Sequence, residues 1–564
     1  MRQTDLIVLR APTVYDCLAH PLLHPPVSEN LSTKRDNSQT ADLLAAIVEL
    51  NKTGGRLGII NMAHTVAGKR FDIESFIDKL NTCVFALETD ERERVPCSLE
   101  TAEIIKKHHP DSKTVLFGAT ARALNKELIN FPQVDAILLT NLNDFSSGQL
   151  AEGASTGKLG KVPGMVWKEK RGKLRRNDLS DECDSKRLDI SALYSGAFSH
   201  VLRLFSSGAI EALQGILSNP VVTIFSGNHP LQLPESIIQP HDNPKNSFRS
   251  PEDVYRDIVE ISRYTSEPIR ISGDMLVPDG HFAERLLSLL QHKPTINSLI
   301  FEFRSVVQPF FIREMARSAP HFRIRLTPGS HDEAVRQRAG RHYTNAELEL
   351  TVSESLKAGT GGIELSFIAG LPGQTPQSIY DTTAYCETLL RLFDGDRRLS
   401  LSLSPFFPPA DAGFGDLAGF GFKQCFSSFE EYLKAQTLPG WADRMEYCTP
   451  EMSTSELALT IYLSLSRLVR LKAKYGQIMA AEAERSATIY DRGMEMTRRI
   501  ANFENNASDD EIALLEPEIT SINRLSLNRT SRPGFPLLLS RPQNVLVAAR
   551  ALIENSPWHR KPVE

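Results

Sequence analysis

The stretch best suited to binding chemistry is residues 370–375 (GLPGQT), which follow an apolar run at residues 363–367 (IELSF). Two glycines and a proline just past a buried strand predict an exposed backbone turn. Its peptide groups can hydrogen-bond an adenine or a carboxylate, and in a barrel this end of a strand faces the ligand. A structural turn is the alternative, but the length of the motif favours a binding site.

A second candidate lies near the N-terminus, where residues 114–117 (TVLF) end at Gly118, Ala119 and Thr120. Such small residues allow a large flat ligand or a nucleotide tail to approach the backbone. A plain strand-to-helix turn explains these residues equally well. Both interpretations therefore stay open for this turn.

Two weaker motifs fit ordinary structure better. His64 follows a strand end, where it could bind a metal or a corrin, but no other ligand-type residue stands at a helpful spacing. A surface or hydrogen-bonded histidine is the favoured interpretation. Residues 413–418 (GFGDLA) match GxGxxA, yet they follow a proline-rich loop and not a strand, which excludes a dinucleotide site.

The composition excludes several classes of protein. With 64 Lys and Arg against 69 Asp and Glu, the chain has a net charge of -5 and no general attraction to nucleic acid. No apolar run approaches the roughly 20 residues that cross a bilayer. The basic residues 168–176 are balanced by acidic residues 178–184, as in a solvated connector. We expect neither a nucleic-acid partner nor a membrane partner.

The seven cysteines are scattered and odd in number, and they form no CxxC. This pattern supports neither a disulfide framework nor a zinc site, so reduced thiols and a cytoplasmic location are expected. The N-terminal residues 1–16 contain only a short apolar stretch that soon meets proline. They predict a strand and not a secretory signal.

Buried-type strands alternate with helical segments along most of the 564 residues. The first series predicts a doubly wound α/β layer, with strands at residues 5–10, 56–61, 84–87, 114–117 and 136–139. The second predicts a barrel or partial barrel, with an open sheet as the alternative and strands at residues 221–225, 269–272, 299–303, 323–326, 363–367 and 399–403. A β-hairpin is expected at residues 165–175, and helices dominate after about residue 426.

Eight segments, taken together and in order, resemble the cobalamin-binding radical S-adenosylmethionine (SAM) family. The N-terminal domain of that family is similar to residues 9–16 (LRAPTVYD), 59–64 (IINMAH), 106–121 (KKHHPDSKTVLFGATA) and 131–141 (FPQVDAILLTN). Its linker hairpin is similar to residues 162–167 (VPGMVW). Its barrel and helical tail resemble residues 327–343 (TPGSHDEAVRQRAGRHY), 367–375 (FIAGLPGQT) and 453–476.

The resemblance implies an α/β chain of four parts. These are a Rossmann-like cobalamin-binding-type domain, a linker with a β-hairpin, a TIM-barrel-like or partial-barrel radical-SAM-like domain, and a helical C-terminal region. The expected boundaries are residues 1–145, 146–210, 211–425 and 426–564.

One departure from the family is decisive. After the first barrel strand the family carries CxxxCxxC, whose thiolates hold a [4Fe–4S] cluster, whereas this chain has Asn228, Gln232 and Glu235 at those positions. Amides cannot replace soft thiolates on such a cluster. We therefore predict that the cluster is absent, that the chain has no metal site, and that radical chemistry is lost. The DxHxxG signature is also missing around His64, which does not exclude cobalamin in this family.

The resemblance also implies residues for each remaining cofactor. The SAM site would comprise Asp274, Ser330, Gly370, Pro372 and Gly373. The cobalamin site would comprise residues in the loops that follow three strands, namely Pro12, Thr13, Gly118, Ala119, Thr120, Thr140 and Asn141. Ligands gather at the carboxyl ends of strands in such sheets. No catalytic residue is assigned.

Three functions are compatible with the sequence. The first is a cobalamin-binding methyltransferase that uses SAM by polar rather than radical chemistry. The second is a non-catalytic binding or scaffolding descendant, a pseudoenzyme, which would act on a protein partner. The third is an unrelated activity that uses Asn228, His229 and Glu235 as polar or acid–base groups. The substrate cannot be inferred from the chain.

Overall fold

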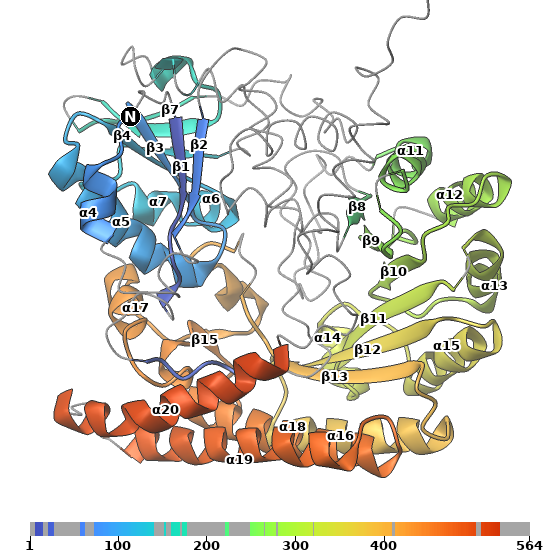
Figure 1. Ribbon diagram of the computed structural model, residues 1–564. Helices are drawn as coiled ribbons and strands as arrows, with labels where there is room; N and C mark the ends of the chain where they lie inside the picture. The colour runs from blue at the N-terminus through green and yellow to red at the C-terminus, as the bar shows by residue number, and fades with distance from the viewer. Residues whose placement is uncertain are drawn as a thin grey trace, which may run out of the picture.

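Two sheets built from parallel strands organise the protein, which we describe from a computed structural model (Figure 1). The description covers residues 6–14, 21–26, 57–62, 73–139, 150, 152–153, 159–169, 172–177, 220–224, 249–263, 265–277, 280–319, 321–408, 412–502 and 509–530. The predicted Thr140, Asn141, Asn228, Gln232 and Glu235 lie outside these residues, as do His64 and His229.

The first sheet contains seven strands in the order β2-β1-β3-β4-β5-β6-β7. They are β1 (Leu6–Arg10), β2 (Leu57–Asn61), β3 (Val84–Glu88), β4 (Lys113–Phe117), β5 (Ala136–Leu138), β6 (Met165–Lys168) and β7 (Leu174–Arg176). Strands β1 to β5 are parallel. The fully buried run VFALE of β3 is typical of a parallel strand covered on both faces. The first predicted strand series is confirmed.

Four helices accompany this sheet, and they are α4 (Ile73–Asp78), α5 (Val95–His108), α6 (Ala119–Ala123) and α7 (Asn125–Leu128). Helix α5 buries Leu99, Ala102 and Ile105 in the same cluster as Phe85 and Leu116 of the sheet. The carboxyl ends of β1, β3 and β4 lie at one edge, which is where the sequence placed a ligand.

The predicted hairpin forms, but it is not a separate connector. Strand β6 pairs antiparallel with β5, and β7 pairs antiparallel with β6, so both continue the first sheet. The tight turn between them uses Gly172 with φ 75°. The glycine turn predicts the hairpin from neighbouring residues alone. The pairing of the hairpin with β5 joins residues distant in sequence, so the local sequence pattern cannot predict it.

The second sheet has six parallel strands in chain order. They are β8 (Val221–Thr223), β9 (Ile269–Ser272), β10 (Leu299–Phe303), β11 (Arg323–Gly329), β12 (Gly362–Ala369) and β13 (Leu399–Pro405). Among the described residues β8 and β13 are not paired with each other, so the strands form a partial rather than a closed barrel. The second predicted strand series is confirmed.

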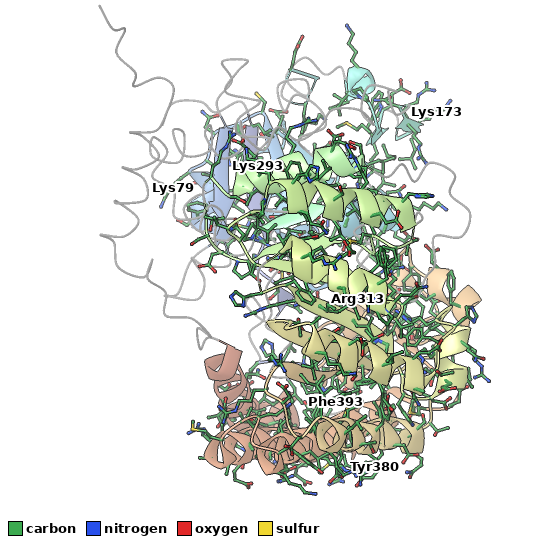
Figure 2. All side chains as sticks on the ribbon, turned by 90° about the vertical axis from the view of Figure 1, so that its right-hand side faces the viewer. Lys79, Lys173, Lys293, Arg313, Tyr380 and Phe393 are labelled. Atoms are coloured by element: carbon green, nitrogen blue, oxygen red, sulfur yellow. The ribbon has the colours of Figure 1, made fainter. Side chains whose placement is uncertain are left out.

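Helices cover one side of this sheet, as Figure 1 shows. They are α11 (Pro251–Ile261), α12 (Gly280–His292), α13 (Pro309–Ser318), α15 (Asn345–Lys357) and α16 (Pro376–Leu392). Figure 2 views this helical layer from outside, with Lys293, Arg313 and Tyr380 spread along it. This one-sided arrangement is that of a barrel wall and not of a doubly wound sheet.

Local capping explains where these helices begin. Ser250 accepts a hydrogen bond from the Asp253 backbone amide and is followed by Pro251 at the first helical position. Thr344 forms a capping box with Glu347 at the start of α15, as the sequence predicts. Further capping boxes start α16 and α18 (Thr454–Lys474).

The C-terminal part is helical, with a small two-stranded sheet before it. Helix α18 packs on α16, where Arg467 lies 4.3 Å from the ring centre of Tyr380, and it is followed by α19 (Ala480–Asn502) and α20 (Asp509–Thr530). Strands β14 (Lys423–Gln424) and β15 (Tyr447–Cys448) pair antiparallel. None of the described helices is both long and apolar enough to cross a membrane.

Contacts distant in sequence tie the first sheet to the C-terminal part. Helix α17 (Phe429–Ala435) buries Phe429 and Tyr432 in the core of the first sheet. Arg92 forms a buried ion pair of 2.5 Å with Glu446. The short segment 21–26 is held by Asn523, whose Nδ2 donates to the Leu22 carbonyl.

One detail of the cysteines differs from expectation. Cys386, Cys425 and Cys448 are free thiols, whereas Cys97 on α5 is disulfide-bonded. The prediction that all thiols are reduced is therefore wrong at Cys97. The scatter of cysteines along the sequence does not show which of them meet in space.

Candidate functional site

The Gly118 turn at the carboxyl end of β4 is filled by the protein itself. Asp90 accepts a hydrogen bond of 2.7 Å from the Ala119 amide, and its carbonyl accepts one of 2.8 Å from the Thr120 hydroxyl. A Cβ on Gly118 would lie 2.4 Å from Asp90 Oδ1, and Gly118 has φ 113°. The small residues of the turn therefore leave room for the Asp90 side chain. This contact explains their small size without a ligand.

A buried charged cluster stands beside this turn. Glu88 at the end of β3 is 1% exposed, and Arg10 Nε lies 3.3 Å from its Oε2. Burial raises the pKa of Glu88 to about 8, the Arg10 charge opposes this rise, and the nearby Asp90 adds to it. The carboxyl group at this edge is thus biased toward its neutral form.

The end of β1 is fixed by Arg94, whose guanidinium donates to the Ala11 carbonyl and lies 3.0 Å from Glu91. Pro12 and Thr13 follow this anchored residue and are buried. The structure places them and the Gly118 turn at the same edge of the first sheet, at the ends of β1 and β4. That part of the predicted cobalamin loop set is therefore brought to one edge.

The second site lies at the carboxyl edge of the partial barrel. Asp274, two residues past β9, is 5% exposed. Its Oδ1 accepts a hydrogen bond of 3.0 Å from the Leu276 amide, and its Oδ2 accepts one of 3.0 Å from the Arg304 amide. Burial raises the pKa of Asp274, while those two amides and the Arg304 charge oppose the rise. The carboxylate is held rigidly and keeps spare acceptor capacity.

Tyr343 connects Asp274 to the arginines of this edge. Its hydroxyl donates a hydrogen bond of 3.3 Å to the Arg304 carbonyl. Burial raises its pKa to about 12, and both Arg341 and Asp274 act on it electrostatically. The ends of β9 and β10 and the segment before α15 thus meet around one aromatic ring.

Ser330 and Arg336 form a satisfied structural unit just beyond β11. Arg336 is fully buried, and it donates to the carbonyls of Ser330 and Tyr343 and to Asn345 Oδ1 over 2.8–3.1 Å. The Ser330 hydroxyl oxygen accepts from the Asp332 amide at 3.1 Å. Ser330 lies at the predicted edge, but its carbonyl and hydroxyl already have protein partners.

The 370–375 turn also satisfies its own backbone. Gln374 Oε1 accepts from the amides of Gly370 and Leu371 at 2.8 and 2.9 Å, and its Nε2 donates to the Ile368 carbonyl. Both turn amides expected to face a ligand are therefore engaged. The motif Gly-Leu-Pro-Gly-Gln therefore fits a structural turn whose backbone is hydrogen-bonded by its own glutamine.

The two glycines of this turn also serve packing. A Cβ on Gly370 would lie 2.8 Å from a methyl of Leu457 on α18, and one on Gly373 would overlap the Arg338 guanidinium. Their φ angles of 96° and 88° require glycine as well. Pro372 lies against Gly421. The prediction that Gly370, Pro372 and Gly373 bind SAM remains a prediction.

The face of the barrel sheet opposite the helices carries alternating charges. Glu302 on β10 pairs with Arg270 on β9 at 3.3 Å and with Arg325 on β11 at 3.2 Å. Arg325 continues the ladder to Glu364 on β12 at 3.1 Å. Apolar branched side chains usually fill a barrel interior, so this polar lining is suited to a polar ligand.

Arg341 is a buried charged residue of this edge that the sequence analysis did not single out. It is 3% exposed, and its Nε, Nη1 and Nη2 have no hydrogen-bond partner in the described part of the chain. It stands between the end of one helix and the N-cap of the next, where a pattern predicts an exposed loop. Only its burial in the fold distinguishes it from an ordinary surface arginine.

The predicted cluster positions Asn228, Gln232 and Glu235 lie outside the described residues. Within the described ranges, no group of three His, Cys, Asp or Glu side chains is arranged to hold a metal ion. The loss of the thiolates thus rests on the sequence, which has no cysteine at any of the three positions.

Comparison with known proteins supports the fold. No protein-family model matches the chain, and no curated protein matches it in sequence. TsrM from Kitasatospora setae, a radical SAM methyltransferase solved with cobalamin and a [4Fe–4S] cluster bound, gives a TM-score of 0.53 at 12% identity. That match covers 89% of this chain and 100% of TsrM.

A second match points the same way. OxsB, a cobalamin-dependent SAM radical enzyme solved with aqua-cobalamin bound, gives a TM-score of 0.50 at 11% identity, over 98% of this chain and 84% of OxsB. Identities this low establish the fold and nothing finer. The resemblance inferred from the sequence is thereby confirmed, since the chain has the fold of the cobalamin-dependent radical SAM enzymes.

Proposed function

We propose that this protein is a cobalamin-binding, SAM-using methyltransferase-like protein that works by polar chemistry. The observation that carries the proposal is the buried Asp274 at the carboxyl end of β9, in a fold shared with TsrM over 89% of the chain. A rigid carboxylate with spare acceptor capacity suits the ammonium group of SAM.

Polar chemistry follows from the sequence of the loop after β8. Without thiolates at Asn228, Gln232 and Glu235, no residue set there suits an iron–sulfur cluster. Cobalamin, when bound, would supply a cobalt centre able to relay a methyl group from a sulfonium to a nucleophile without a radical. The protein would contribute the positioning of SAM and the exclusion of water.

The fit to each cofactor differs. The carboxyl edge of the barrel offers Asp274 and a polar lining, which suit SAM. The edge of the first sheet offers small residues at Gly118 and Ala119, but the Ala119 amide and the Thr120 hydroxyl are bonded to Asp90. Cobalamin would therefore lie against this turn by shape, with the Pro12–Thr13 loop beside it, and not through those two donors.

The first experiment tests cobalamin binding. The protein purified in the presence of hydroxocobalamin and then desalted should retain a corrin absorbance spectrum in the visible range. A desalted protein with no corrin absorbance would overturn the proposal. Iron and sulfide analysis of the same sample should find no cluster, and near-stoichiometric iron would show that the ligand assignment at residues 228, 232 and 235 is wrong.

The second experiment tests SAM binding by titration calorimetry. Asp274→Asn should weaken SAM binding about 10- to 100-fold, because a hydrogen bond to a charged group contributes about 1.5–3 kcal/mol. Asp111→Asn, in an exposed turn before β4, is the matched control and should leave SAM binding unchanged. Equal affinities for SAM in wild type and Asp274→Asn would remove Asp274 from the site.

A second candidate function is a non-catalytic scaffold derived from the same fold. It is favoured by the two internally bonded turns, since both Gly118–Thr120 and Gly370–Gln374 satisfy their own polar groups. Turnover of SAM or methyl transfer by the isolated protein would reject it. Retention of cobalamin without any SAM turnover would support it.

A further inference from the structure

Two free cysteines lie together on the small two-stranded sheet. Cys448 is the last residue of β15, and Cys425 directly follows β14. The Cys425 amide donates a hydrogen bond of 2.8 Å to the Glu446 carbonyl, which continues the antiparallel pairing of the two strands by one residue. Residues two apart on a strand share a face, so the Cys448 side chain lies on the same face as Glu446 and Cys425. The two cysteines are therefore diagonal neighbours across the strands.

The two thiols are within reach of each other. Burial is the main cause that raises the pKa of Cys425, and the charge of Cys448 and a side-chain hydrogen bond with it add to the rise, while Lys423 opposes it. Cys425 is half-buried, whereas Cys448 is only 9% exposed. One thiol of the pair is thus open to a reagent from solvent, and the other stands behind it.

The segment between the two cysteines connects the first sheet with the barrel edge. Phe429 and Tyr432 of α17 are buried in the core of the first sheet, and Glu446 forms the buried ion pair with that domain. Tyr447 packs in the opposite direction, in one cluster with Leu371 of the barrel edge. Figure 1 shows α17 and β15 between the first sheet and helices α18 to α20. A bond between the cysteines would close a loop that holds contacts to both sides.

A disulfide at this position requires a small backbone movement. Diagonal neighbours on antiparallel strands have Cα atoms about 7–8 Å apart, whereas a disulfide joins Cα atoms about 4.4–6.8 Å apart. Strands β14 and β15 contain two residues each, so little pairing resists the movement. A disulfide closed against such resistance is reduced more easily than an unstrained one. This property suits a bond that opens and closes.

We propose that Cys425 and Cys448 form a reversible disulfide that locks the segment between them onto the first sheet. The oxidant is a small disulfide such as oxidised glutathione. The more exposed Cys425 loses its proton to solvent, attacks one glutathione sulfur and expels a glutathione thiolate. Cys448, deprotonated in turn, attacks the Cys425 sulfur of the mixed disulfide and expels the second glutathione. The two thiols lose two electrons and two protons, and one oxidised glutathione becomes two reduced molecules.

Peptide mapping tests the bond. The full chain is equilibrated with increasing ratios of oxidised to reduced glutathione, alkylated, and digested with trypsin without reduction. Trypsin cleaves after Lys434 and Arg444, so the two cysteines lie on separate peptides that only a disulfide joins. The linked pair should appear as the buffer becomes oxidising and disappear when reduced glutathione is added back. A pair that never forms in oxidised glutathione, or never opens in reduced glutathione, would overturn the proposal.

Proteolysis of the folded protein tests the lock. The Lys434 side chain is exposed on α17, and trypsin can cleave after it only when this helix opens. We expect cleavage to be about tenfold or more slower in the oxidised protein, because the crosslink removes conformational freedom from the opened segment. Fragments are separated after reduction. Equal rates in the oxidised and reduced proteins would show that the bond does not hold the segment.

Three variants assign the effect to this pair. Cys425→Ser and Cys448→Ser should lose both the linked peptides and the change in cleavage rate, whereas Cys386→Ser, which removes a buried free thiol on α16, should keep both. Each reduced variant should be cleaved at the reduced wild-type rate, which verifies its folding. All three keep the Cys97 disulfide, so a rate change that depends on Cys97 would persist in Cys425→Ser. Such persistence would overturn the proposal.

Discussion

Two polar groups at the carboxyl edges of the two sheets differ in whether the protein satisfies them. At the first sheet Asp90 bonds the Ala119 amide and fills the space beside Gly118, so the turn is complete without a ligand. At the barrel the guanidinium of Arg341 is buried with no acceptor in the described part of the chain. The Gly118 turn is therefore satisfied within the protein, whereas Arg341 is a buried charge with no described acceptor, which costs stability.

The largest effect is expected at Arg336, the satisfied arginine of the barrel edge. Arg336→Met should lower the free energy of unfolding by about 3–5 kcal/mol, because it orphans buried carbonyls and breaks a charged network. Urea denaturation measures this as a lower midpoint with an unchanged slope. Arg341→Met should be no less stable than wild type without ligand. If both variants lose the same free energy of unfolding, the two arginines do not differ as described.

The next effect concerns the filled turn of the first sheet. Gly118→Ala places a methyl 2.4 Å from the position of Asp90 Oδ1, in a backbone conformation that essentially only glycine adopts. We expect a loss of about 3 kcal/mol in the free energy of unfolding. Thermal and urea unfolding measure it. A near-neutral Gly118→Ala would show that the turn has open space for a ligand.

A pH effect should mark the buried carboxyl group beside that turn. The folded protein keeps the Glu88 proton up to about pH 8, while the unfolded chain releases it near its ordinary pKa of 4.5. The folded state therefore binds more protons between these values, and stability falls as pH rises through this window. Glu88→Gln should remove that fall.

The size of this pH effect is bounded. Relative to wild type, Glu88→Gln should gain stability as the pH rises from 5 to 8, on the order of 2–3 kcal/mol, because only wild type must give up the stabilising proton of Glu88. Melting curves at pH 5, 6.5 and 8 would show it. Parallel pH profiles for the two proteins would mean that Glu88 is ionised in the fold.

The smallest effect on stability is expected at Gly329, at the end of β11. Gly329→Ala meets Arg341 Nη1 and a Leu371 methyl only at 3.6 and 3.4 Å, so its cost comes from φ 78° alone. We expect a loss of about 1 kcal/mol in the free energy of unfolding. If Gly329→Ala lowers the free energy of unfolding as much as Gly118→Ala does, the two glycines are equally tightly packed.

Local signals predicted most of the fold. The strand runs at residues 299–303 and 399–403 begin where β10 and β13 begin, because continuous apolar segments mark buried parallel strands. Thr344 and Ser453 start helices as predicted, since a capping box is complete within four residues. Neither signal depends on distant parts of the chain.

The site was harder to predict because its determinants are distant contacts. Nothing near Gly118 in sequence indicates that Asp90 fills the turn, and Gln374 accepts from the amides of Gly370 and Leu371 that seemed free for a ligand. Arg341 follows a helix end at Gly340, a context that favours exposure, and its burial arises only when β11 and the 370–375 turn close around it. Asp274 and Ser330 were both predicted and are both buried at the barrel edge, but the carbonyl and hydroxyl of Ser330 already have protein partners.

The segment 21–26 has a consequence for how the chain is made. The His24 amide donates to Asn523, and the Asn523 side chain donates to the Leu22 carbonyl, across 499 and 501 residues of sequence. Synthesis proceeds at about 5–20 residues per second, so roughly 25–100 seconds separate the emergence of the two partners from the ribosome. The segment 21–26 therefore completes its hydrogen bonds only after α20 has emerged, whereas the apolar partners of Leu22, among them Ala11 and Val14, are made long before.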